Sequence, residues 1–157
     1  MPLPWSRELA QVLADAEEIA RGARKPFDST HLLLALFTLP NRAQATLRER
    51  GIDDDRLIDL VTMTSAEPAD VVPAIRERAR QVAESQSWHE VDCLHLLAAV
   101  ARTRESRAYE LLERCGVDLI RLRTQIVSYF TSGNMPRRLG GARGNVATTI
   151  VRDDPPR

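Results

Sequence analysis

The chain has 157 residues, of which 43% are hydrophobic and only 4% aromatic, and its 22 basic and 22 acidic side chains leave no net charge. This length suits one domain with a core of aliphatic side chains, and the composition excludes a chain that is disordered throughout. The lack of net positive charge gives nucleic-acid binding no electrostatic support.

Apolar residues recur at helical spacing through the first half of the chain, and capping residues divide them into four predicted helices. The first begins after Ser6, a good N-cap, and is expected to end by Gly22 and Pro26. The second follows Asp28 or Ser29 and is apolar on nearly all sides, which predicts a buried, central position. The other two are expected over about 42–50 and 54–63.

A linker over about 65–72, which contains proline and acidic residues, separates these helices from four more. The second four are expected to begin near Pro73, after Asp92, at Arg107 and after Asp118. Nothing in this part of the chain alternates with a period of two, so no strand is expected.

The two halves repeat one another. The stretch STHLLLAL at 29–36 returns as CLHLLAAV at 93–100, and Gly-Ile-Asp at 51–53 returns as Gly-Val-Asp at 116–118. The interval between the two histidines differs by only one position from the interval between the two glycines, and a common offset of this kind predicts a tandem duplication. We therefore expect an all-α fold of about eight helices, in which a four-helix unit occurs twice in one domain. The expected ranges are 4–130 for the domain, about 5–64 for repeat 1 and about 73–130 for repeat 2.

The composition changes at Thr131. Residues 131–157 are rich in glycine and proline and contain five arginines and two aspartates, which leaves the preceding body with a net charge of −3. Such a segment buries too little apolar surface to offset the entropy lost on ordering, so a disordered tail is expected.

Histidine and cysteine are the side chains best suited to chemistry. Cys93 and Cys115 lack the spacing of a disulfide framework or a zinc site, and buried, inert thiols are expected. His31 and His95 could form a metal or acid–base pair, or could be structural histidines bonded to the backbone. The structural alternative is favoured because no third ligand stands at a fixed spacing. We expect neither catalysis nor a cofactor.

No apolar run approaches the ~18 residues of a membrane span. The N-terminus also lacks the basic and then apolar regions of a signal peptide. A cytoplasmic protein with no membrane contact is expected.

The duplicated unit resembles the N-terminal domain of the Clp family of AAA+ unfoldases, the Clp repeat domain. Trp5-Ser6-Arg7-Glu8 is similar to the family's opening segment, and 13–20 to its first helix, rich in alanine and glutamate. The doubled His-Leu-Leu and Gly-Ile/Val-Asp are similar to the family's motifs, and the match covers roughly 4–130. The chain has no Gly-x-x-x-x-Gly-Lys-Ser/Thr, so the family's ATPase is missing. The resemblance implies a docking module that stands alone, or a truncated chain.

Members of that family that recognise phosphoarginine use an acidic residue in each repeat, at the positions that hold Thr30 and Leu94 in this chain. A neutral side chain cannot pair with a guanidinium as a carboxylate does. The resemblance therefore implies that this domain does not bind phosphoarginine in that manner and holds its ligand mainly by apolar contact. Asp28 and Asp92 could substitute for the lost acids or could act only as helix caps.

By resemblance, the function is a protein-interaction module that docks peptides, adaptors or Clp machinery in protein quality control. The alternative is an accessory subunit that packs on a Clp proteolytic ring, and an enzyme that uses the two histidines is a third, less supported hypothesis. The candidate partner-binding residues lie near the starts of the two central helices and are expected to form an exposed apolar patch. They are Trp5, Phe27, Asp28, Thr30, Val91, Asp92 and Leu94.

Overall fold

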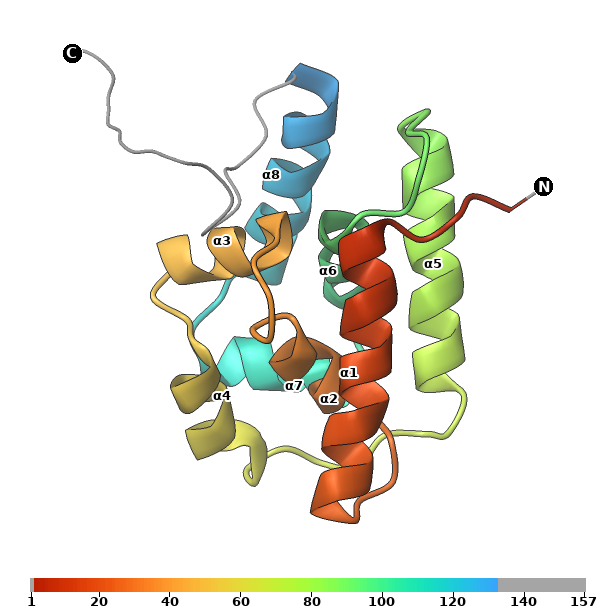
Figure 1. The fold of residues 1–157 in the computed structure, drawn as a ribbon. Helices are drawn as coiled ribbons and strands as arrows, with labels where there is room; N and C mark the ends of the chain where they lie inside the picture. The colour runs from red at the N-terminus through yellow and green to blue at the C-terminus, as the bar shows by residue number, and fades with distance from the viewer. Residues whose placement is uncertain (1, 133–157) are drawn as a thin grey trace.

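The computed structural model describes residues 2–132, which form eight α-helices and one isolated β-bridge (Figure 1). This arrangement confirms the predicted all-helical body. The tail expected over 131–157 lies outside the described residues, except that 131 and 132 extend the last helix. The helices are α1 (Arg7–Ala23), α2 (Ser29–Ala35), α3 (Arg42–Glu49), α4 (Asp54–Val61), α5 (Val71–Ser85), α6 (Cys93–Ala101), α7 (Arg107–Arg114) and α8 (Leu119–Ser132).

Side-chain caps begin most of these helices. Ser6 Oγ accepts a hydrogen bond from the backbone N–H of Leu9 at 3.1 Å, and the side chain of Asp53 caps α4 in the same way. Two boundaries lie close to the expected positions. Helix α1 ends at Ala23, between Gly22 and Pro26, and its C-cap Arg24 adopts the left-handed conformation (φ 56°). Helix α5 begins two residues before Pro73, which the first turn tolerates because the N–H groups there have no partner within the helix.

The turns that follow α3 and α7 are built alike. Gly51 and Gly116 have φ values of 77° and 89°, a conformation that side chains with a Cβ rarely adopt. The residue after each glycine donates its N–H to a leucine carbonyl in the last turns of the helix, Ile52 to Leu47 and Val117 to Leu112, each at 3.1 Å. The two halves thus share a turn as well as a sequence. The exact repeat boundaries stay a prediction.

The core is centred on α2 and α6, the two copies of the repeated apolar stretch. Every residue of α6 is buried, and this helix packs against α5, α8, α3 and α7. Helix α2 packs against α1, α7 and α4. One exception is Leu34, which is only half-buried and lines a shallow hollow of about 220 Å³ with Phe37 and Ile58. Helix α2 is therefore less completely enclosed than its sequence indicated.

Candidate functional site

The start of α2 is held by a reciprocal capping box. Asp28 Oδ1 accepts the backbone N–H of Thr30 at 2.9 Å, and His31 Nδ1 accepts the backbone N–H of Asp28 at 3.0 Å. In the usual capping box a glutamate or glutamine makes the second of these bonds, and here an imidazole replaces it. His31 is therefore bonded to the backbone, and Asp28 serves as a helix cap.

The start of α6 repeats this arrangement at deeper burial. Asp92 Oδ2 accepts the N–H of Leu94 at 2.9 Å, and His95 Nδ1 accepts the N–H of Asp92 at 2.8 Å. The His95 ring is fully buried and stacks on Phe130 of α8, with centroids 4.2 Å apart. Burial first, and then the nearby charge of Arg42, lower the pKa of His95 from 6.5 to about 3. The ring is neutral near pH 7, as a structural histidine would be.

Each capping aspartate also forms an ion pair with the other repeat. Asp28 Oδ2 lies 2.9 Å from Arg107 Nη1, at the first residue of α7, and Asp92 Oδ1 lies 3.0 Å from Arg42 Nη1, at the first residue of α3. The two ion pairs join residues at equivalent positions of the two repeats. The central helix of each half is thus tied to the half that does not contain it, and both carboxylates already have a guanidinium partner.

Arg107 and the segment between the repeats extend this network. Arg107 Nε donates to Thr64 Oγ1 at 2.6 Å, and its Nη2 donates to the carbonyl of Val61 at 3.0 Å. Glu67 accepts the N–H of Ser29 at 2.8 Å and the N–H of Arg107 at 2.7 Å. The predicted linker is therefore part of the junction between the repeats.

Three residues of this junction were not predicted from the sequence as site residues: Arg42, Glu67 and Arg107. A sequence feature does point to the two arginines, because an arginine follows the N-cap of the next helix in both repeats, and Arg42 follows Asp28 at nearly the same interval as Arg107 follows Asp92. Pairing across the repeats rather than within each repeat depends on how the halves pack, and the sequence pattern contains no information about that.

The contacts of Asp28 make its ion pair sensitive to acid. Burial alone would raise the pKa of Asp28, but hydrogen bonds from Thr30 and Arg107 stabilise the charged form and hold the pKa below its ordinary value of 3.8. A carboxyl with a lowered folded-state pKa stabilises the fold above its unfolded pKa of about 4. That stabilisation is lost as the pH falls through the lowered value.

Replacing Asp92 by asparagine should lower the free energy of unfolding by about 1–3 kcal/mol, because Asn still caps α6 but leaves Arg42 without its partner. The Asp92 side chain is 7% exposed and that of Arg42 26%, so solvent screening keeps the effect below that of a fully buried pair. Urea unfolding near pH 7 measures the change. Asp53→Asn is the matched control, since Asp53 caps α4 through a 2.9 Å bond to the N–H of Arg56. Equal stability of the two variants would contradict a role for the ion pair.

Trp5 lies where the start of the chain meets repeat 2. Its neighbours bond to Val91, with the N–H of Ser6 donating to the Val91 carbonyl and the N–H of Val91 to the Pro4 carbonyl, each at 2.8 Å. The indole is half-buried, and the guanidinium of Arg80 on α5 lies 3.9 Å from its ring centroid. This geometry is that of a cation–π contact.

The structure separates the candidate partner-binding residues into two groups. Trp5 lies beside the start of α6, whereas Phe27 lies beside the start of α2, at the other end of α1 (Figure 1). A helix of 17 residues is about 25 Å long. The first group comprises Trp5, Val91, Asp92 and Leu94, and the second Phe27, Asp28 and Thr30.

Most of these residues are not available to a partner. Val91 and Leu94 are fully buried and Thr30 is 2% exposed, in a core where α6 packs against α5, α8 and α3, and α2 against α1, α7 and α4. The expectation of one exposed apolar patch is therefore wrong. Trp5 and Phe27 remain half-exposed, and their binding role stays a prediction.

The fold and these contacts define a class of protein, an all-helical body of two equivalent four-helix repeats joined by their own capping residues. Residues 74–146 match the family model of the Clp repeat (R) N-terminal domain. This match covers slightly less than half of the chain, and over that part the chain is similar to a Clp repeat N-terminal domain, in agreement with the resemblance seen in its sequence.

The fold is also similar to that of a solved structure, the N-terminal domain of the caseinolytic protease associated chaperone ClpD from Arabidopsis thaliana. The TM-score is 0.61 at 14% sequence identity, over 79% of this chain and 95% of that chain. This likeness concerns the fold alone. No curated protein matches the chain in sequence. Within residues 2–132, no helix is long and apolar enough to cross a membrane.

Proposed function

We propose that this chain is a docking module that binds a peptide, an adaptor or a component of the Clp machinery through the surface around Trp5. The observation that carries the proposal is the half-exposed indole at the junction of the two repeats of a Clp repeat domain. Tryptophan is among the residues that contribute most binding energy at protein interfaces, because its large ring loses little conformational entropy on binding.

The surroundings of Trp5 favour a preorganised surface. The parallel bridge to Val91 fixes its backbone, while Arg80 and Arg76 of α5 lie 3.9 Å and 5.4 Å from the ring centroid. A ring that is already positioned gives up little freedom when a partner arrives. Phe27 is the second half-exposed candidate, but its position beyond the far end of α1 assigns it to a different surface.

The burial of the family's ligand positions supports the proposal that phosphoarginine is not read in the manner of the relatives. Thr30 and Leu94 are buried, and the nearby carboxylates of Asp28 and Asp92 are each paired with an arginine of this chain. A ligand guanidinium would have to displace that internal arginine before it could form an equivalent pair.

Trp5→Ala should reduce capture of the partner about 30-fold, the effect of losing roughly 2 kcal/mol at an aromatic anchor. Tagged wild-type and variant proteins are incubated with native cytosol of the source organism, and the captured proteins are identified by mass spectrometry. Ile58→Ala is the matched control, since Ile58 is 55% exposed on α4 and belongs to a separate surface. Far-UV circular dichroism checks that the variants keep their helices.

The identity of the captured protein decides between the alternatives. An unfoldase, an adaptor or a substrate that depends on Trp5 supports the docking module. A peptidase ring captured without an unfoldase supports the accessory-subunit alternative instead. Capture that is equal for Trp5→Ala and Ile58→Ala would contradict the proposal.

A further inference from the structure

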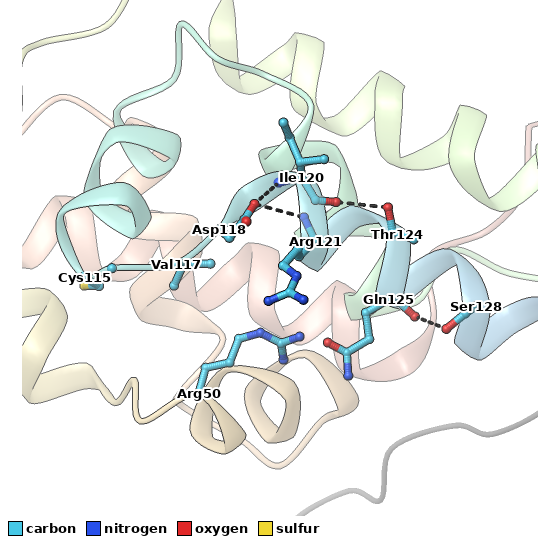
Figure 2. Close-up of a pocket in the computed structure, with 10 residues that line it drawn as sticks. Arg50, Cys115, Val117, Asp118, Ile120, Arg121, Thr124, Gln125 and Ser128 are labelled. Atoms are coloured by element: carbon cyan, nitrogen blue, oxygen red, sulfur yellow. Dashed lines mark hydrogen bonds between the residues drawn. The ribbon is translucent and has the colours of Figure 1, made fainter.

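A cavity of about 650 Å³ lies between the end of α3, the turn after α7 and the first turns of α8 (Figure 2). It is separate from the capping contacts of α2 and α6 and from Trp5. Arg50 comes from repeat 1 and Arg121 from repeat 2, and Figure 2 shows their guanidinium groups turned toward each other across the cavity. The packing of the repeats thus brings two positive charges to one hollow.

Neither arginine forms an ion pair within residues 2–132. Arg50 Nη1 donates to the carbonyl of Thr46 at 3.1 Å, a neutral partner. By contrast, Arg42 and Arg107 at the junction of the repeats each pair with an aspartate. Two like charges that face one another repel. An anion between them would remove this repulsion and accept charge-assisted hydrogen bonds from both sides.

Asp118 is the only carboxylate among the described lining residues, and it is already engaged. Its Oδ1 accepts the backbone N–H groups of Ile120 and Arg121, each at 3.1 Å, so it caps α8. Arg56 adds a positive charge at the edge, where its Nη2 donates to the carbonyl of Cys115 at 3.5 Å. Positive charge therefore dominates the cavity. The amides at the start of α8, which would otherwise suit a phosphate, are occupied.

Apolar side chains also line the cavity. Ile120, in the first turn of α8, is 67% exposed, and Val117, in the turn after α7, is half-buried. Further along the same face of α8, Thr124 and Ser128 also line the cavity. Charged groups next to apolar side chains fit a peptide side chain and its neighbour better than a free ion, which would leave the apolar surface uncovered.

We propose that this cavity binds an acidic segment of a partner protein, with a glutamate or aspartate carboxylate between Arg50 and Arg121 and a neighbouring apolar side chain on Ile120. We choose an acidic occupant because its negative charge complements the positive charge of the cavity. The chain's own C-terminal residues are poorly suited, since 133–157 contain five arginines and two aspartates. The site does not depend on the surface around Trp5.

Fluorescence anisotropy of a labelled peptide of alternating glutamate and leucine tests the proposal on the purified full-length chain. We expect saturable, submillimolar binding that weakens about tenfold or more in Arg121→Gln, because a charge-assisted hydrogen bond is lost. Arg123→Gln is the matched control, since it removes the same charge two residues away on α8 and Arg123 does not line the cavity. Ile120→Ser should also weaken binding. Thermal unfolding checks that each variant is folded.

Further measurements distinguish this site from a simple anion site and from the surface around Trp5. The same peptide with glutamine in place of glutamate should bind at least tenfold more weakly, and inorganic phosphate at equal concentration should not displace the acidic peptide. Trp5→Ala should bind this peptide as the wild type does, which separates this site from the docking surface proposed above. The inference is overturned if the acidic peptide does not bind or if Arg121→Gln and Arg123→Gln bind it alike. It is also overturned if inorganic phosphate displaces the labelled peptide as effectively as the unlabelled peptide does.

Discussion

Lowering the pH from about 7 to about 4.5 is expected to cost the fold about 2–3 kcal/mol through His95 alone, and His95→Gln should remove this part of the pH dependence. The imidazole is fully buried, and its pKa lies near 3 in the folded chain against 6.5 for the ordinary side chain. Between these values the unfolded chain binds a proton that the folded chain excludes, so stability falls as the pH falls. The full difference, reached near pH 3, is about 5 kcal/mol.

The hydrogen bond at Nδ1 gives this exclusion a structural cause. Nδ1 accepts the backbone N–H of Asp92, so protonation would place two donors against each other and break the capping box of α6. The other nitrogen, Nε2, is buried with no partner among the described residues. The neutral ring therefore carries its proton on Nε2, and a second proton on Nδ1 would replace an accepted bond with a clash of two donors, next to the charge of Arg42.

Urea unfolding at several pH values gives the free energy of unfolding of the wild type and of His95→Gln. The comparison shows how much of the pH dependence comes from His95. Above about pH 4.5 most carboxylates keep their charge, so the histidine dominates the comparison. Glutamine can still accept the bond from the N-cap, as in the usual capping box. His31→Gln is the matched control, because His31 Nδ1 accepts the equivalent bond at 3.0 Å. Parallel curves for the wild type and His95→Gln would mean that the buried ring does not resist protonation.

Leu97→Ala should lower the free energy of unfolding by about 2–5 kcal/mol, the usual cost of truncating a large buried side chain and leaving a cavity. Leu97 is fully buried in α6, and Leu33, its equivalent in the first copy of the repeated stretch, is fully buried in α2 as well. We expect Leu33→Ala to cost a similar amount. The midpoint and slope of urea unfolding give both values.

Leu34→Ala provides the contrast, because it removes the same atoms from a half-buried position. Leu34 lines an open hollow with Phe37 and Ile58, so truncation creates no closed cavity, and less than about 2 kcal/mol should be lost. A loss at Leu34 as large as at Leu97 would show that the hollow is closed in solution. From the sequence alone, truncation of Leu34 and of Leu97 is expected to cost the same ~2–5 kcal/mol, since both leucines lie in copies of the same apolar stretch.

Local rules were enough to predict the helices. Capping residues such as Ser6, Asp53 and Asp92 satisfy the first N–H groups of a helix whatever its tertiary surroundings, and glycines with positive φ end α3 and α7 for an equally local reason. The boundaries were predicted closely as well. Helix α1 ends one residue after Gly22, and α5 has Pro73 in its first turn, although its start at Val71 takes two residues from the expected linker.

The site was predicted less well. Candidate residues were placed correctly at the starts of the two central helices, and the backbone bonds of His31 and His95 confirm the structural alternative for both. Their exposure was not predicted correctly. Leu94 lies in the first turn after a cap and was expected to be exposed, yet it is fully buried. No sequence pattern predicts that Arg50 and Arg121 meet, because they lie far apart in the sequence and belong to different repeats.

By itself the sequence determined the helical class, the duplication and the caps, because each depends on residues within a few positions or on a repeat visible by comparison. The tertiary structure alone decided which repeat supplies the partner of each capping aspartate, that His95 is stacked and buried, and where two arginines without an ion pair in the described part of the chain meet. The physical reason is that ion pairing, desolvation and charge convergence depend on distances between segments that are remote in the chain. Those distances exist only once α3 and α7 have packed against the opposite repeat.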